Sequence, residues 1–325
     1  MRRRNWMNLL ASLLLIVLVL TGCGGAATQP APAGAAKETK VPQTEQPKQS
    51  RQTAYPITVK DGAGRDVTIP AEPKRIVSVA PSNTELVFAV GKGGALVGRS
   101  QFDDYPPEVK QIDSIGGFAP PNYEQIVGKQ PDLLLMIGGS KDVREKLVTD
   151  YKLNVFVVDP KNFDELYASI KSLGLILNAQ EQADKVTVEM QKAVKAITDK
   201  TGKAAGKPKV FYQVWDNPLM TAGSGTFIDD LIRLAGGENV GASVKGWANF
   251  SAEQLVAANP DIVIASTRDA AEKVKTQQGW EGLKAVKEAR VYGVEDANLV
   301  SRPGPRLVLG LKWLAETIHP ELFKQ

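Results

Sequence analysis

Residues 124–137, EQIVGKQPDLLLMI, and residues 253–266, EQLVAANPDIVIAS, carry one pattern twice in a chain of 325 residues. In each copy a Glu-Gln pair opens a short helical stretch, and a Pro-Asp pair follows it. A run of large apolar residues then predicts a buried strand. The repetition predicts two lobes of similar topology, with residues 82–84 echoed by residues 224–226 further out.

Outside this repeat, segments with strand and helix character continue to alternate. Strands are expected at residues 75–80, 133–137, 155–158, 210–214 and 291–294, and helices at 82–91, 123–129 and 142–151. Residues 57–60 and 65–69 flank a DGAG turn and predict a hairpin. Ser82 and Glu85 have the spacing of a capping box. The alternation predicts an α/β fold with mainly parallel sheets.

Residues 162–200 contain one glycine and no proline, and they separate the two predicted lobes. They predict two helices, at 163–177 and 179–199, the second with apolar residues at spacings of three and four. The expected division is a signal peptide at 1–23, a tether at 24–54, an N-terminal lobe at 55–160, inter-lobe helices at 161–201 and a C-terminal lobe at 202–325. A long helix that joins two lobes resists wide opening, so we expect small rocking motions about a cleft between the lobes.

The N-terminus has the layout of a secretory signal, because Arg2, Arg3 and Arg4 precede an apolar run over residues 9–20. The run ends in Leu-Thr-Gly-Cys, which resembles a bacterial lipobox and implies lipidation of Cys23. The alternative is an ordinary signal peptide with a chance cysteine. Residues 24–54 are rich in Ala, Pro, Gln, Thr and Lys and predict a flexible tether to the membrane.

The composition excludes several classes of protein. Cys23 is the one cysteine and His319 the one histidine, which excludes an intramolecular disulfide, a zinc site of the CxxC type and a His-rich metal site. Three of the basic residues lie at positions 2–4, so most of the net charge of +4 is outside the folded part. The charge therefore gives no reason to expect binding to nucleic acid.

Several longer stretches carry a resemblance to a known family. They are RIVSVAPSNTELVFAVG at 75–91, DYPPEVKQIDSIGGFAPPNYEQIVGKQPDLLL at 104–135, LMTAGSGTFIDDLIRLAGGENV at 219–240, FSAEQLVAANPDIVI at 250–264 and SRPGPRLVLGL at 301–311. In number and order they resemble the helical-backbone (class III) substrate-binding proteins of ABC importers, which handle vitamin B12, haem and ferric siderophores. The motifs DYPPEV, NPLMTAG and SRPGPR look most like the vitamin B12-binding members.

The resemblance implies a monomeric, non-enzymatic binding protein of the bacterial cell envelope. It would be lipid-anchored, face the periplasm or the cell exterior, and deliver a corrinoid to an ABC permease dimer with its ATPase subunits. A ferric siderophore or haem is the alternative ligand, and the hairpin at 57–69 resembles the iron-complex members more. A surface-anchored hydrolase that uses carboxylates alone is the rival from another class, although the sequence has neither a GxSxG motif nor a P-loop.

Aromatic side chains in loops at the sheet edges are the candidate walls for a large flat ligand. By resemblance, Tyr105, Phe118 and Trp247 occupy such positions, and Trp215 follows a predicted strand that should end at the cleft. Each could instead fill the core of its own lobe. Trp280 and Trp313 are expected in the core.

Arginines could donate to oxygen atoms of the ligand. Arg302 matches a cleft position of the vitamin B12-binding group, or it is a solvated loop residue, whereas Arg306 is expected in a structural ion pair. Arg99 and Arg268 could also reach the cleft. If several arginines converge there, an anionic siderophore suits the cleft better than a near-neutral corrinoid.

Glu124 and Glu253 begin the two repeats. Asn122 with Gln125, and Ser251 with Gln254, have capping-box spacing, which leaves both glutamates free to point outward from the first turn of a helix. They could simply interact with the helix dipole. The resemblance implies instead that each is a docking carboxylate for an arginine of the permease.

Overall fold

The structure is a computed structural model that describes residues 51–117, 121–139 and 141–324. The predicted signal peptide, Cys23, Phe118 and all but the end of the predicted tether lie outside the described residues.

A hairpin opens the described chain and is fixed to the first sheet by its turn. Strands β1 (Ile57–Lys60) and β2 (Asp66–Ile69) pair antiparallel. Asp61 accepts the backbone N–H groups of Ala63 and Arg65 at 2.9 Å and the Arg65 guanidinium at 2.6 Å. The N–H of Gly62 donates to the carbonyl of Val157 at 2.7 Å, which ties the turn to strand β6 (Val155–Val157). The sequence predicted this hairpin correctly.

The N-terminal lobe, formed by β1–β6 and the helices among them, holds a four-stranded parallel sheet in the order β4-β3-β5-β6. The strands are β3 (Ile76–Ser78), β4 (Leu96–Gly98), β5 (Leu133–Met136) and β6 (Val155–Val157), and the helices are α1 (Pro81–Ala89), η1 (Gly93–Ala95), η2 (Pro107–Gln111), α2 (Tyr123–Gly128) and α3 (Lys141–Thr149). The predicted parallel sheet is confirmed.

The C-terminal lobe, formed by β7–β12 and their helices, holds a mixed sheet in the order β10-β8-β7-β11-β12, with β9 also paired to β7. The strands are β7 (Lys209–Asp216), β8 (Leu219–Ala222), β9 (Glu238–Asn239), β10 (Trp247–Asn249), β11 (Ile262–Ala265) and β12 (Val291–Gly293). The helices are α6 (Phe227–Leu234), η3 (Val240–Ser243), α7 (Ala252–Ala258), α8 (Arg268–Thr276), α9 (Lys284–Lys287), α10 (Asn298–Ser301), α11 (Leu307–Ile318) and α12 (Pro320–Phe323). Strands β7, β11 and β12 are parallel, whereas β8 and β10 are antiparallel.

The aspartate of the repeated Pro-Asp pair makes the same kind of hydrogen bond in both lobes. Asp132 accepts the backbone N–H groups of Lys74 at 2.7 Å and Arg75 at 3.0 Å, and Asp261 accepts that of Lys209 at 2.7 Å. Asp132 thus holds the beginning of β3 beside β5, and Asp261 holds the beginning of β7 beside β11. The Pro-Asp motif is therefore a structural element of both lobes.

The turn that precedes each Pro-Asp pair is repeated as well. Gln130 and Asn259 occupy the same repeat position and adopt left-handed backbone angles, with φ of 48° and 45°. This conformation ends a helix and reverses the chain into the next strand.

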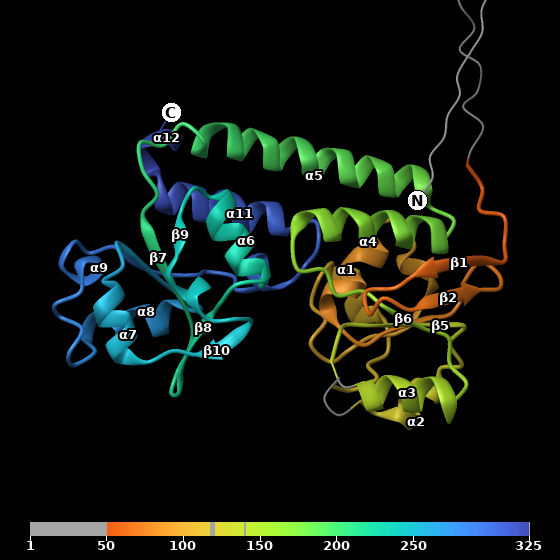
Figure 1. Ribbon diagram of the computed structural model, residues 1–325. Helices are drawn as coiled ribbons and strands as arrows, with labels where there is room; N and C mark the ends of the chain where they lie inside the picture. Colours follow the sequence, from red (N-terminus) through yellow and green to blue (C-terminus); the bar gives the residue numbers. More distant parts are fainter. Residues whose placement is uncertain (1–50, 118–120, 140, 325) are drawn as a thin grey trace, which may run out of the picture. The chain divides into compact units, whose positions relative to one another are not determined.

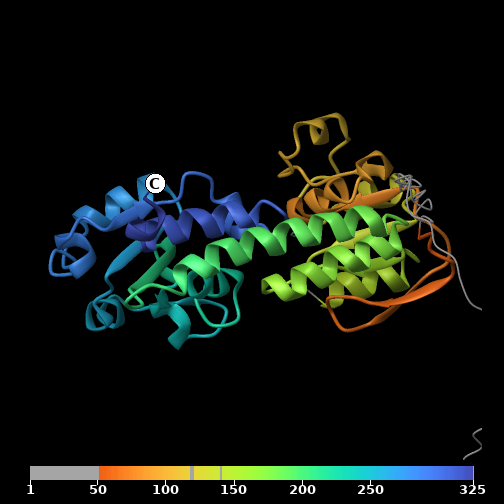
Figure 2. The ribbon, with the colours of Figure 1, turned by 90° about the horizontal axis from the view of Figure 1, so that it is seen from above.

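Two helices connect the lobes. Helix α4 (Phe163–Ile176) leads into α5 (Gln180–Thr201), which packs on α4 and, further along, on α11 and α12. In Figures 1 and 2 the long green helix α5 runs beside elements of both lobes. Thr53 Oγ1 donates to the carbonyl of Leu175 and the Tyr55 hydroxyl to that of Ile176, both at 2.8 Å, so the first described residues are bonded to the end of α4.

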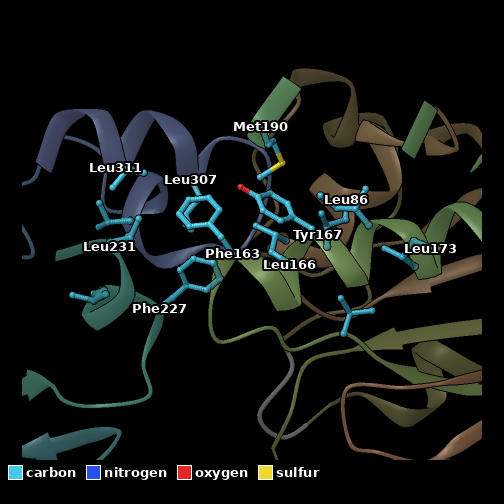
Figure 3. Close-up of a cluster of buried hydrophobic side chains, with 14 of the residues drawn as sticks. Leu86, Phe163, Leu166, Tyr167, Leu173, Met190, Phe227, Leu231, Leu307 and Leu311 are labelled. Carbon is cyan, nitrogen blue, oxygen red and sulfur yellow. The ribbon is translucent and has the colours of Figure 1, made fainter. Parts of the chain in front are cut away.

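One hydrophobic core passes from lobe to lobe through these helices. It contains Leu86 of α1, Leu133 of β5, Leu231 of α6 and Leu311 of α11. Figure 3 shows Phe163 and Tyr167 of α4 lying among residues of both lobes. Each lobe also has a smaller core of its own on the far side of its sheet, one around Ile126 and Leu134 and the other around Phe211 and Trp280.

The predicted capping box at Ser82 and Glu85 is wrong. The N-cap of α1 is Ala80, which makes no side-chain cap, and Pro81 is the first helical residue. Glu85 is buried and its carboxylate is bonded to arginines of the other lobe. The spacing fits a capping box, but the helix begins two residues earlier than the pattern requires, because its N-cap is Ala80 and not Ser82.

Candidate ligand-binding cavity

A cavity of about 550 Å³ is lined by residues of both lobes. The N-terminal lobe and the connection from β6 to α4 contribute residues 80–82, 137 and 158–161, and the C-terminal lobe contributes residues 225–227, 246–247 and 301–303. This volume is in the range of cavities that bind small molecules. Hollows of about 650 and 760 Å³ are lined by C-terminal-lobe residues and the segment leading into β7, without the predicted aromatics. The cavity between the lobes is therefore the candidate site.

The starts of two helices contribute to the lining of this cavity, one from each lobe. Pro81 and Ser82 begin α1, and Thr226 and Phe227 begin α6. Thr226 caps its helix by accepting the N–H of Asp229 at 3.2 Å. The first N–H groups of a helix carry partial positive charge, so both helix starts favour oxygen acceptors on a ligand.

The predicted aromatic residues have different positions relative to this cavity. Trp247 begins β10, lines the cavity and is 53% exposed, so its indole is available to a ligand. Trp215 lies near the end of β7 and is 59% exposed, but it is not among the lining residues, and its ring N–H donates to the carbonyl of Asn217 at 2.9 Å. Trp280 is buried in the core of the C-terminal lobe as expected.

Tyr105 stands beside the cavity without lining it. The Arg306 guanidinium lies 4.0 Å from the centre of the Tyr105 ring, a cation–π geometry. The tyrosine ring is 43% exposed, so one part of it stays open to solvent. It therefore belongs to a contact between the lobes at the edge of the cavity.

Arg302 and Arg306 of the C-terminal lobe meet Glu85 and Asp104 of the N-terminal lobe in a group that we call the inter-lobe clasp. Arg306 donates to both oxygens of Glu85, through Nε at 2.9 Å and Nη2 at 2.6 Å. Arg302 donates from Nη1 to Glu85 at 3.3 Å and also bonds Asp104. Hydrogen bonding to Glu85 raises the pKa of the Arg306 guanidinium above its usual range. The expected structural ion pair of Arg306 is confirmed, and Arg302 lines the cavity while sharing the clasp.

The loop that carries Asp104 and Tyr105 is bonded to α1 through the preceding residue, Asp103. The neighbouring Asp103 is buried and accepts hydrogen bonds from the hydroxyls of Thr84 and Ser100. Burial raises the pKa of the Asp103 carboxyl above its ordinary value, against the effect of these two bonds. The bonds of Asp103 therefore fix the backbone of the loop that positions Asp104 and Tyr105.

Arg99 and Arg268 do not converge on the cavity. The Arg99 guanidinium donates to the carbonyls of Val109 at 3.0 Å and Ile112 at 3.1 Å, which fixes its own loop. Arg268 pairs with Glu295 at the surface. Of the arginines considered from the sequence, Arg302 alone is among the described lining residues.

Glu124 and Glu253 are exposed in the first turns of α2 and α7. Asn122 accepts the N–H of Gln125 at 3.1 Å, and Ser251 and Gln254 form a complete capping box. The caps are thus supplied by other residues, and both carboxylates face solvent. Hydrogen bonds from its own backbone N–H and from Ser251 lower the pKa of Glu253.

Sequence reasoning missed Glu85 and Asp104. The sequence pattern assigned Glu85 to a helix cap, and it assigned no role to Asp104 within the DYPP motif. A carboxylate within an otherwise buried helical stretch was the available signal, because such a group needs a partner.

Across the residues that the structure describes, no group of three or more His, Cys, Asp or Glu side chains is placed to hold a metal ion. In the same part of the chain, none of the helices is both long and apolar enough to cross a bilayer.

Comparison with known proteins identifies the family. The model of the periplasmic binding proteins matches residues 76–297. The chain belongs to the periplasmic binding protein family. Within this family, the chain is 36% identical to the ABC transporter substrate-binding lipoprotein YvrC of Bacillus subtilis over 97% of this chain and 98% of that protein. The name of this relative describes the substrate-binding component of a transporter.

Two other relatives have names that state different ligands. A vitamin B12-binding protein of Pectobacterium carotovorum is 29% identical over 76% of this chain and 89% of its own length. The crystal structure of a possible iron-binding, periplasmic solute-binding protein of Staphylococcus epidermidis superposes with a TM-score of 0.68 at 34% identity, over 77% of this chain and all of that one. The two-lobed α/β fold predicted from the sequence is therefore confirmed, together with the resemblance to this family.

Proposed function

We propose that the chain is the extracytoplasmic substrate-binding component of an ABC importer and that it captures a corrinoid of the vitamin B12 type. The transport role is supported by the family and by the substrate-binding relatives. The corrinoid follows from the motifs that look most like vitamin B12-binding proteins and from the relatives of that name. The chain itself would catalyse no reaction.

The observation that carries the ligand class is the charge balance at the cavity. Arg302 and Arg306 are matched by Glu85 and Asp104, and Lys161 is paired with Asp159 at 2.6 Å. No group of unpaired arginines faces the cavity from the described residues, as an anionic siderophore would require. A near-neutral ligand with amide groups suits the indole of Trp247 and the two helix starts better.

A ferric siderophore or haem is the second candidate. The iron-binding name of the Staphylococcus relative favours it, and so does the lining of the cavity by Arg302. These ligands would leave the fold and the transport role unchanged.

The partners follow from the same proposal. Glu124 and Glu253 would each meet an arginine of the permease, one per lobe, and the ATPase subunits would supply the energy. Lipidation at Cys23 would hold the protein at the outer face of the cell membrane. The receptor would act as a monomer, and it has no expected role with nucleic acid.

A fluorescence titration of the full chain tests the ligand. Cyanocobalamin, cobinamide, haemin and a ferric hydroxamate siderophore are added in separate experiments, and quenching of tryptophan emission is followed. Saturable quenching by a corrinoid at micromolar or tighter affinity supports the proposal. Binding of an iron complex without any response to corrinoids would replace the ligand and keep the transport role.

A further inference from the structure

Of the two carboxylates bonded to Arg302, Glu85 is also bonded to Arg306, whereas the hydrogen bonds of Asp104 are to Arg302. Glu85 is bonded at both oxygens by Arg306, and its contact with Arg302 is the longest of the three, at 3.3 Å. Asp104 meets Arg302 at both of its oxygens, one of them 3.4 Å from Nη2. Asp104 is therefore the principal neutralising group for Arg302, the one arginine among the described residues that line the cavity.

The two members of this pair differ in burial. The side chain of Arg302 is 14% exposed, whereas that of Asp104 is 52% exposed. Arg302 also donates to the carbonyl of Phe102 at 3.2 Å and to Glu85 at 3.3 Å, so groups other than Asp104 help to position its guanidinium. A change at position 104 would thus alter the charge at the cavity edge more than the position of the arginine.

A guanidinium at a cavity wall binds carboxylates and phosphates in a bidentate manner when it is free. Here Asp104 already occupies that role, so a carboxylate on the ligand must displace it or lie beside it. Like charges side by side discriminate strongly against the wrong ligand. A neutral amide meets no such repulsion.

We propose that Asp104 is a specificity-determining residue that disfavours ligands bearing a free carboxylate at the Arg302 edge of the cavity. This inference rests on the proposed function, because it concerns how the same cavity distinguishes neutral corrinoids from anionic iron complexes. Asp104 acts by pairing with the guanidinium of Arg302, and the buried Glu85 positions Arg302 and Arg306 through its hydrogen bonds to both.

The test compares Asp104→Asn with wild type in the full chain. Asparagine keeps the shape and one acceptor for Arg302 but removes the charge. Haemin, which carries two propionates, is the anionic probe, and cyanocobalamin, which has no free carboxylate, is the neutral one. Asp113→Asn removes the same charge from an exposed pair with Lys129, at residues that do not line the cavity, and serves as the matched control.

We expect Asp104→Asn to bind haemin about fivefold more tightly than wild type, the effect of one partly exposed charge pair. Cyanocobalamin affinity should change by less than about twofold, and Asp113→Asn should match wild type for both ligands. Asp104→Ser, which removes the charge and the amide together, should show the same direction. Urea midpoints of all variants verify that they are folded.

An Asp104→Asn protein that binds haemin no more tightly than wild type overturns the inference, and so does equal tightening for both ligands. Failure of the corrinoid assignment gives a different result. In that case wild type ignores cyanocobalamin, while the haemin comparison between wild type and Asp104→Asn is still decisive for Asp104.

Discussion

Phe163 of α4 and Phe227 of α6 meet edge to face, with ring centroids 5.4 Å apart and planes at 79°. Phe163 begins the inter-lobe helix, and Phe227 begins a helix of the C-terminal lobe and lines the cavity. Both rings are buried in the core that runs through both lobes. The lobes therefore share apolar packing next to the place where a ligand would bind.

Phe163→Ala should lower the free energy of unfolding by about 3 kcal/mol, because it removes a buried ring from a shared core. Urea unfolding followed by tryptophan emission and by far-UV circular dichroism should give one coincident transition in wild type. Leu309→Ala, at an exposed position, should cost less than about 0.5 kcal/mol. Two separate transitions in wild type would show that the lobes unfold independently.

Glu85→Gln should cost about 3 kcal/mol, because it removes the carboxylate that compensates two largely buried arginines. The side chain of Glu85 is only 3% exposed, so water cannot replace it readily. Glu295→Gln, in the exposed pair with Arg268, should cost less than about 1 kcal/mol. Equal urea midpoints for the two variants would contradict a structural role for the clasp.

Trp247→Ala should weaken ligand binding about tenfold or more, since the indole is the exposed aromatic surface of the cavity. Trp215→Ala separates cavity contact from simple exposure, because Trp215 is equally exposed and does not line the cavity. We expect it to keep wild-type affinity in the fluorescence titration. A loss of affinity in Trp215→Ala alone would move the ligand to the end of β7.

The double variant Glu124→Arg/Glu253→Arg should abolish uptake by cells while leaving ligand affinity unchanged. Both carboxylates are exposed at helix starts outside the cavity, so reversing them changes the surface offered to the permease. Glu181→Arg reverses an exposed first-turn glutamate of α5 and should support normal uptake. If the double variant lost ligand affinity, the two glutamates would belong to the binding site.

Glu72 gives a pH-dependent contribution to stability. Its hydrogen bonds with Lys74 and then Lys92 lower the pKa of Glu72 from 4.5 to about 2. A lowered pKa means that the charged form stabilises the fold, so the contribution is present above about pH 4.5 and disappears as the pH falls towards 2. The difference in urea midpoint between wild type and Glu72→Gln should therefore shrink over this interval. A constant difference would assign the effect to shape and not to charge.

Local patterns predicted much of this fold. The hairpin, both parallel strand sets and the inter-lobe helices follow from periodicity and turn residues, and the Pro-Asp repeat located the two central strands. The caps at Asn122 and Ser251 were predicted correctly as well. These features depend on residues that are near one another in the chain.

The clasp could not be predicted in the same way. Glu85 and Arg306 meet only after both lobes have folded, and the apolar stretch around Glu85 indicates that it needs a partner without identifying that partner. The mixed character of the second sheet also depends on contacts that form only in the folded lobe. Strand β8 pairs antiparallel with β7, and β10 pairs antiparallel with β8. Sequence reasoning made the same prediction for Trp247 and Trp215, as aromatic residues at the cleft. They differ in the structure because Trp247 begins β10, beside the cavity, whereas Trp215 lies near the end of β7 and does not line it.

The bonds from Thr53 and Tyr55 to the end of α4 determine how a mechanical load would enter the molecule. A force pulling on the chain from its N-terminal side would be transmitted to the α4–α5 pair, which packs on both lobes. These bonds involve neither the cavity residues nor the starts of α2 and α7. Tension on a tether would therefore enter through the helix pair that packs on both lobes, and not through the residues of the binding cavity or the two exposed glutamates.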